Sequence, residues 1–156
     1  MTVFINKQHL DILKQEGIKN YPYECCGLLL GVINNSEKNV IKVIPVENDW
    51  QNQKYLFPAN YTHDLKRDLR DSFAINPLTF LQIQKEARND NLNIIGIYHS
   101  HPDHPAIPSD FDEAIASSVY SYIILSVEKG EVKEILSWVF NEENKFVKEE
   151  ITALFP

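Results

Sequence analysis

The stretch HSHPDHPAIPSDFD, residues 99–112, brings together the side chains best suited to chemistry. Side chains alternate along a strand, so His99 and His101 point to the same face and Ser100 points away. Pro102 cannot donate to a strand ladder, so the strand is expected to end there with both imidazoles at its mouth. Imidazole nitrogens are common metal ligands, and the pair therefore predicts a metal site.

A third ligand has three candidates nearby, because a catalytic zinc ion needs about three protein ligands and one position for water. They are His104, Asp110 and Asp112. We favour Asp112, which would be held rigidly in a helix that starts at Ser109, whereas His104 lies in the middle of a loop. Helix capping alone would explain Ser109 and Asp112. It does not explain two histidines on one face of a strand end, so zinc is the preferred interpretation.

Hydrolysis at such a centre also needs a proton acceptor that is not a ligand, usually a carboxylate. Glu24 opens the apolar stretch ECCGLLLGVI, residues 24–33. An unpaired ionised acid inside that stretch would cost several kcal/mol. Glu24 therefore either lies at a solvent edge or is kept buried for a catalytic task, and the sequence leaves both possibilities open.

Helices and strands must hold these residues, and their order indicates the fold. Apolar periodicity predicts helices that begin after the capping residues Asn6, Asn76 and Ser109, ending near Lys19, Asn89 and Ser118. Strands are predicted at 24–33, 39–48, 92–101, 119–128, 131–140 and 145–151. This order predicts an α/β protein, a mixed sheet flanked by helices, in a single domain spanning residues 1–156.

Residues 50–72 are less regular and are predicted to form an insert or flap. Leu65, Leu69 and Phe73 recur at every fourth position, which favours a short amphipathic helix. A solvated helix lying on the core is the simpler interpretation. We also expect the segment from Leu65 to Phe73 to be mobile beside the zinc cleft.

Composition narrows the class of protein. The chain has 156 residues, of which 44% are hydrophobic, and a net charge of −7. It has no basic stripe for a phosphate backbone and no apolar run of about 20 residues, so neither nucleic acid nor a membrane is expected as a partner. A disulfide between the adjacent Cys25 and Cys26 would be strained, which favours reduced buried thiols over a catalytic thiol or an extra metal ligand. We expect a cytoplasmic protein.

Glu24, the run His99-Ser100-His101-Pro102, Ser109 and Asp112 together resemble the JAMM motif of the MPN+ family, also called Mov34/MPN/PAD-1. The resemblance spans most of the chain, and HSHPDHPAIPSDFD looks most like the small stand-alone bacterial members. It implies a cytidine-deaminase-like α/β sandwich. It also implies that His99, His101 and Asp112 bind Zn²⁺.

The resemblance further implies that Glu24 takes a proton from water and gives it to the leaving amine, while Ser109 hydrogen-bonds the oxyanion. Such enzymes are metallopeptidases or isopeptidases that cut at or near the C-terminus of a ubiquitin-like or sulfur-carrier protein. The alternative is a non-catalytic MPN-type scaffold with a structural zinc, although no ligand position is lost here. A zinc nucleobase deaminase is discarded, because it needs His-x-Glu and a later Pro-Cys-x-x-Cys.

Overall fold

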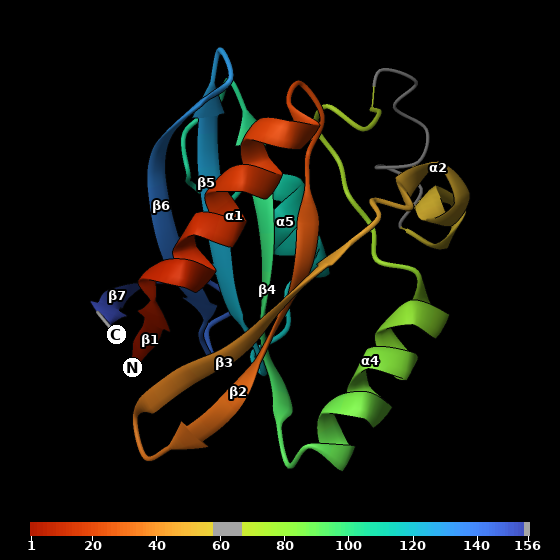
Figure 1. Cartoon of the computed structure of the whole chain (residues 1–156). Coiled ribbons are helices and arrows are strands. Elements are labelled where there is room, and N and C mark those ends of the chain that lie inside the picture. The colour runs from red at the N-terminus through yellow and green to blue at the C-terminus, as the bar shows by residue number, and fades with distance from the viewer. Residues whose placement is uncertain (58–66, 155–156) are drawn as a thin grey trace.

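The computed structural model describes residues 1–57 and 67–154, and its centre is one mixed sheet (Figure 1). The sheet closes on itself in the order β1-β3-β2-β4-β5-β6-β7. Most neighbours are antiparallel, whereas β4 with β5, and β1 with both β3 and β7, run parallel. The strands are β1 (Thr2–Asn6), β2 (Cys26–Asn34), β3 (Glu37–Val46), β4 (Asn93–Pro102), β5 (Ser121–Glu128), β6 (Glu131–Phe140) and β7 (Phe146–Leu154).

The helices begin at the predicted caps. Asn6 Oδ1 accepts a hydrogen bond from His9 N, and Asn76 Oδ1 accepts one from Leu78 N, so both side chains satisfy donors that the first turn leaves unpaired. None of the helices in the described ranges is long and apolar enough to cross a membrane. The helices are α1 (Lys7–Asn20), α2 (Trp50–Gln53), the 3₁₀ turn η1 (Lys54–Leu56), α4 (Pro77–Asn89) and α5 (Asp110–Ile115).

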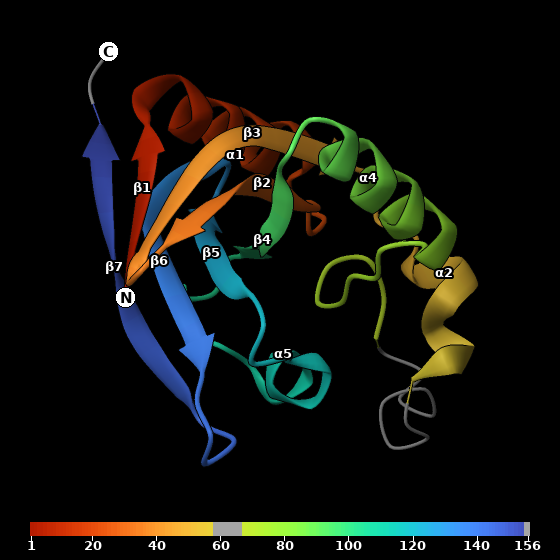
Figure 2. The ribbon, with the colours of Figure 1, turned by 90° about the horizontal axis from the view of Figure 1, so that it is seen from below.

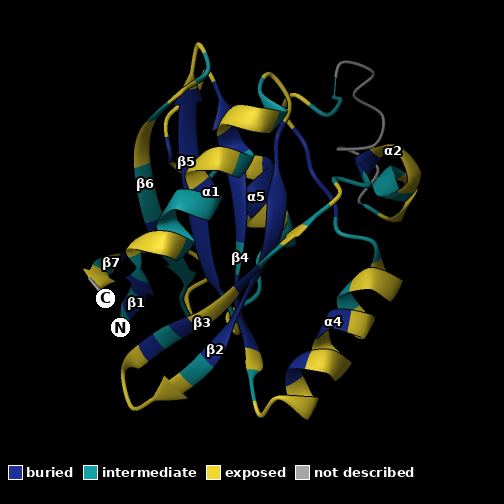
Figure 3. Cartoon of the chain, viewed as in Figure 1, coloured by how far each residue is buried: buried dark blue, intermediate teal, exposed yellow. Residues whose placement is uncertain are grey.

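The curved sheet has helices on both of its faces. Helix α1 contacts β1, β3, β5, β6 and β7, and so lies inside the curve. Helices α4 and α5 lie on the other side of the central strands (Figures 1 and 2). Strands β4 and β5 are buried along most of their length, while the outward surfaces of α1 and α4 are exposed (Figure 3).

Strand β2 shows why the apolar run ECCGLLLGVI is needed. Leu29 packs in the core cluster around Leu13 of α1, whereas Leu28 and Leu30 pack with Ile83 of α4. Both faces of the strand are therefore covered, as a continuous apolar run predicts. The mixed sheet flanked by helices is confirmed.

Two details of the predicted architecture are corrected. The sheet is a closed barrel rather than an open layer of a sandwich. Closure depends on β1, which was not predicted because it has only five residues and its last, Asn6, is the cap of α1. Helix α5 ends at Ile115 rather than Ser118, since Ala116 is extended.

The helix predicted over Leu65, Leu69 and Phe73 is wrong where it can be compared. Leu65 lies outside the described residues, and residues 67–73 form turns and irregular chain. Phe73 is buried with Trp50 and Phe111, and Leu69 packs against that cluster. The spacing of Leu69 and Phe73 thus reflects packing against the core and not a helix.

Candidate metal centre

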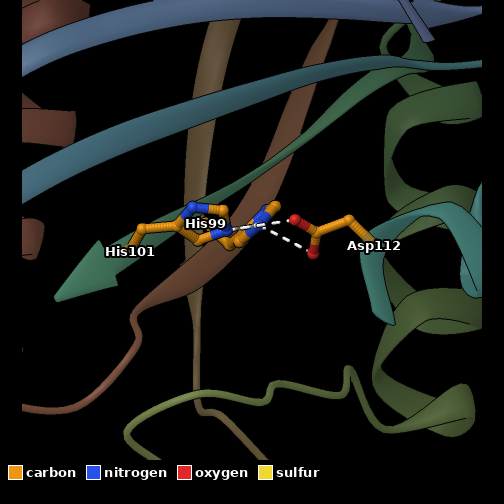
Figure 4. A group of neighbouring side chains, drawn as sticks. All are labelled: His99, His101 and Asp112. Atoms are coloured by element: carbon orange, nitrogen blue, oxygen red, sulfur yellow. Dashed lines mark hydrogen bonds and ion pairs between the residues drawn. The ribbon is translucent and has the colours of Figure 1, made fainter. Parts of the chain in front are cut away.

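His99, His101 and Asp112 form a buried group that can hold a metal ion, with their ligand atoms all within 4.8 Å of one another. The Nε2 atoms of His99 and His101 are 3.1 Å apart. Each lies 3.0 Å from a different oxygen of the Asp112 carboxylate, Oδ1 for His99 and Oδ2 for His101. Figure 4 shows the two rings of β4 and the carboxylate of α5 pointing toward one point.

Strand alternation and a helix cap bring these three side chains together. His99 and His101 lie on the same face of β4, and the strand ends at Pro102 as predicted. Ser109 Oγ accepts from Asp112 N at 3.1 Å, and Asp112 Oδ2 accepts from Ser109 N at 2.9 Å. This capping box fixes the carboxylate that faces the imidazoles. The carboxylate of Asp112 therefore caps α5 and faces the two imidazoles at the same time.

The protonation pattern of the imidazoles fits a metal. His101 Nδ1 lies 2.8 Å from Pro105 O, an acceptor, so Nδ1 carries a hydrogen and Nε2 is the nitrogen that can bind a metal. Nε2 lies 3.0 Å from Asp112 Oδ2, a contact that either a proton or a metal ion between the two atoms would satisfy. Burial lowers the pKa of His99, which favours the neutral, ligating form.

A buried phenylalanine holds the first imidazole. The rings of Phe73 and His99 stack with centroids 4.5 Å apart and planes inclined by 20°. The contact restricts rotation of the ring without using its nitrogens. The contact of Phe73 with His99 was not predicted. The two residues are 26 positions apart in the sequence, and no local pattern links them.

Strand pairing brings Glu24 to the metal group. Cys26 pairs with His99, and Ser100 N then donates to Cys25 O at 3.1 Å. Glu24 lies two residues before the start of β2, next to this pairing. Glu24 and His101 line one cavity of about 280 Å³.

Glu24 is buried, with 5% of its surface exposed, and its Oε1 has no hydrogen-bond partner among the described residues. Burial raises the pKa of Glu24 well above its usual value, and the nearby carboxylates of Asp112 and Asp71 raise it further. The guanidinium of Arg67 opposes that shift. The side chain of Glu24 is therefore buried against the cavity, and its catalytic role stays a prediction.

The backbone of Glu24 is held at both ends. Glu24 N donates to Leu69 O at 2.7 Å, and Asn48 Nδ2 donates to Glu24 O at 3.2 Å. Asn48 Nδ2 also donates to Ser72 O at 3.0 Å, while its Oδ1 accepts from Trp50 N at 3.2 Å and Ala74 N at 3.1 Å. One amide thus joins three segments of the chain. Asn48 was not identified from sequence, where it stands only as the last residue of a predicted strand.

The remaining candidates lie around the same cavity or away from it. Ser109 and His104 line the cavity, but His104 is exposed and is not part of the metal group. Asp110 is exposed at the start of α5. The preference for Asp112 over these two as third member of the group agrees with the geometry.

Cys25 and Cys26 are free and buried. Burial raises the pKa of Cys25 to about 11 and that of Cys26 further still. Both thiols therefore stay neutral near pH 7, and a neutral thiol is a poor nucleophile and a poor metal ligand. Their predicted role as small buried residues is consistent with these environments.

The structure is thus that of an α/β protein in which a buried group of two histidines and one carboxylate at the end of a strand could hold a metal ion. The sequence model of one protein family, the prokaryotic homologs of the JAB domain, matches residues 6–141. The chain belongs to this family.

Two curated relatives are similar over most of the chain. A desampylase of Pyrococcus furiosus is 30% identical over 131 residues, which cover 83% of this chain and 76% of the relative. A probable TtuB-protein conjugate cleaving protease of Thermus thermophilus is 25% identical over 128 residues, covering 82% and 72%. Both names describe cleavage of a protein conjugate or modification by that relative.

Solved structures share the fold. A solution structure of a protein from Desulfitobacterium hafniense has a TM-score of 0.77 and 25% identity, covering 100% of this chain and 94% of its own. The crystal structure of a JAB1/MPN domain protein from Archaeoglobus fulgidus has a TM-score of 0.51 and 15% identity, covering 97% and 99%. The JAB/MPN fold is thereby confirmed.

Proposed function

We propose that this protein is a zinc metallopeptidase that hydrolyses an amide bond at or near the C-terminus of a ubiquitin-like or sulfur-carrier protein. The observation that carries the proposal is the buried Glu24 carboxyl facing the same cavity as His101, next to a group that can hold a metal. A buried acid whose Oε1 has no partner within residues 1–57 and 67–154 favours this proposal over a scaffold with a structural metal.

His99, His101 and Asp112 would hold the zinc ion. Tetrahedral ligands at about 2.1 Å from zinc lie about 3.4 Å apart, close to the 3.0 and 3.1 Å between the ligand atoms here. When bound, zinc would supply Lewis acidity, polarising a carbonyl and lowering the pKa of water. Nitrogen and carboxylate donors with one position left open are typical of catalytic zinc.

Glu24 would accept a proton from the attacking water and deliver it to the leaving nitrogen. A carboxyl with a raised pKa is suited to both steps, because it gains and loses its proton nearer neutral pH. Glu24 lies just before β2, which pairs with β4, and Leu69 and Asn48 bind its backbone. The acid is thus pre-positioned by the fold rather than by a flexible loop.

Ser109 would stabilise the oxyanion that forms when the carbonyl is attacked. Its Oγ already accepts from Asp112 N, and a hydroxyl that accepts through a lone pair can still donate its hydrogen. Ser109 lines the cavity, so that hydrogen can be directed at a bound carbonyl oxygen. One oxyanion donor typically contributes about 100- to 1,000-fold in kcat.

The substrate class is supported by the relatives. Their names describe a desampylase and a probable TtuB-protein conjugate cleaving protease, and a carrier-protein substrate is proposed for this chain on that similarity. Two reduced, buried cysteines are consistent with action in the cytoplasm.

The test combines metal analysis with turnover of carrier-protein adducts. We expect one zinc per chain, activity lost on chelation, and a Glu24→Gln variant that keeps its zinc while kcat falls about 100- to 10,000-fold. Glu142→Gln, an exposed turn residue, is the matched control and should be unchanged. Absence of stoichiometric zinc, or full activity of Glu24→Gln, would refute the proposal. A wild type that turns over no adduct, but melts earlier after chelation, would indicate a scaffold instead.

A further inference from the structure

The loop between β4 and α5, residues 103–109, supplies one backbone group to the metal centre. Pro105 O lies 2.8 Å from Nδ1 of His101, the ring nitrogen that does not face Asp112. A hydrogen bond at this nitrogen fixes the orientation of the ring and leaves Nε2 for a metal. A loop carbonyl can do this only while the loop itself keeps its place. The contacts that hold Pro105 O are therefore part of the metal centre.

Two side chains from neighbouring strands hold the carbonyls on either side of Pro105. Ser126 Oγ of β5 donates to His104 O at 2.6 Å, and Trp138 Nε1 of β6 donates to Ala106 O at 3.0 Å. Three consecutive carbonyls of the loop thus each contact a different side chain. The ring of Pro105 also restricts its φ angle. The carbonyl in the middle therefore has little freedom to turn away from the imidazole.

The β4–β5 pairing brings Ser126 to this loop. Strands β4 and β5 are parallel, and His101 and Ser126 are partners in their register. Partners in a ladder point to the same face of the sheet, so the imidazole and the hydroxyl that holds its acceptor share one face. Ser126 and Ala106 are both buried, and water cannot readily replace the hydrogen bonds made there.

Other contacts hold the two ends of the loop. Asp103 is exposed, and its carboxylate oxygens lie 2.9 and 2.7 Å from the Tyr21 hydroxyl, while Oδ1 also accepts from Lys129 N at 2.9 Å. At the other end, the capping box that starts at Ser109 fixes the entry to α5. These contacts act two or more residues away from Pro105 O. The side chains from β5 and β6 act on the peptides directly next to it.

We propose that Ser126 and Trp138 are positioning residues of the metal centre. They hold Pro105 O on His101 Nδ1, and in this way they present Nε2 of the ring to the metal. The inference rests on the proposed function, because it takes His101 as a zinc ligand. Neither Ser126 nor Trp138 belongs to the metal group or to the described lining of the cavity, so each acts through the loop.

Zinc affinity of three variants tests this inference. Ser126→Ala removes the hydroxyl, and Trp138→Phe removes the Nε1–H while keeping an aromatic ring. Each should weaken Zn²⁺ binding about 10- to 100-fold, the usual effect of losing a group that orients a ligand, as measured by competition with a chromophoric chelator. Ser126→Thr keeps a hydroxyl at the same position and should recover most of the affinity.

A second measurement needs neither metal nor turnover. Exchange of the His101 Nδ1 hydrogen with water can be followed by ¹⁵N NMR on the metal-free protein. This hydrogen is protected while it is bonded to Pro105 O, so exchange should be about 10-fold faster in Ser126→Ala and in Trp138→Phe than in wild type.

The matched control is Ser137→Ala, which removes another buried serine hydroxyl from the strand that carries Trp138. Ser137 Oγ donates to Glu149 Oε1 at 2.9 Å, so this variant should lose thermal stability but keep wild-type zinc affinity and exchange of the His101 hydrogen.

Two results would overturn the inference and leave the proposed function intact. One is wild-type zinc affinity and exchange in both Ser126→Ala and Trp138→Phe. The other is an equal loss of zinc affinity in Ser137→Ala, which would mean that the effect follows global stability. A wild type that takes up no stoichiometric zinc would overturn the proposed function and this inference together.

Discussion

Replacing Asn48 with alanine tests how the site is held together. The side chain makes four hydrogen bonds, to the carbonyls of Glu24 and Ser72 and from the amides of Trp50 and Ala74, at 3.0 to 3.2 Å. Truncation removes all four at once. Two carbonyls and two N–H groups then lose a partner in a partly buried region, where water can replace only some of them.

The expected loss follows from these contacts. A hydrogen bond in a folded protein contributes about 0.5 to 1.5 kcal/mol net, and four of them give about 2 to 4 kcal/mol once partial rehydration is allowed. For a chain of this length each kcal/mol moves the melting temperature by about 2 to 4 °C, so a decrease of roughly 5 to 15 °C is expected.

Urea unfolding of Asn48→Ala measures this loss, with Asn52→Ala as the control. Asn52 is exposed and donates a single bond to Asp49 Oδ1 at 2.7 Å, so its replacement should cost less than about 0.5 kcal/mol. A second measurement separates the site from global stability. Metal affinity should be retained, because the metal group lies on β4 and α5, while kcat should fall as Glu24 loses its anchor.

Two results would refute this reasoning. If Asn48→Ala were as stable as Asn52→Ala, the four hydrogen bonds of Asn48 would make no net contribution to the free energy of unfolding. If the variant lost stability but kept full kcat in the folded state, the Asn48 contact would not position Glu24.

Two further predictions concern buried groups outside the metal centre. Lys38 Nζ lies 3.2 Å from Glu149 Oε2 inside the barrel, so Lys38→Met leaves the Glu149 charge buried and should lower the free energy of unfolding in urea by about 3 to 5 kcal/mol. Lys42 is exposed, and Lys42→Met should change this free energy very little. Equal losses in the two variants would contradict the prediction. The pKa of Cys25 is raised on folding to about 11, so the folded state holds its proton longer and stability is lost as pH rises above about 9. Between pH 8 and pH 10 wild type should lose about 1 kcal/mol more than Cys25→Ala, and parallel pH profiles would exclude the effect.

Local rules were sufficient for the elements that carry the metal group. Strand alternation placed His99 and His101 on one face, Pro102 ended the strand, and Ser109 began the helix that presents Asp112. Each of these depends on residues close in sequence and on standard backbone geometry. The caps of α1 and α4 were predictable for the same reason.

Features that depend on distant pairing were not predictable. Strand β1 closes the barrel through parallel pairing with β3 and β7, and its five residues carry no signal for partners more than a hundred residues away in β7. Phe73 and Asn48 contact His99 and Glu24, which are 26 and 24 residues away in the sequence. Their spacing in sequence does not reveal what they contact.

The position of Glu24 shows how a local ambiguity is resolved by register. From sequence, an acid at the start of an apolar strand could face either solvent or the interior. The pairing of Cys26 with His99 reduces that ambiguity, because Glu24 lies two residues before Cys26 and lines the same cavity as His101. A shift of one residue would turn Glu24 to the opposite face of the sheet from the histidines. The pairing of β2 with β4 thus brings Glu24 close to the two histidines of the metal group, and a change that shifts this pairing is expected to lower activity.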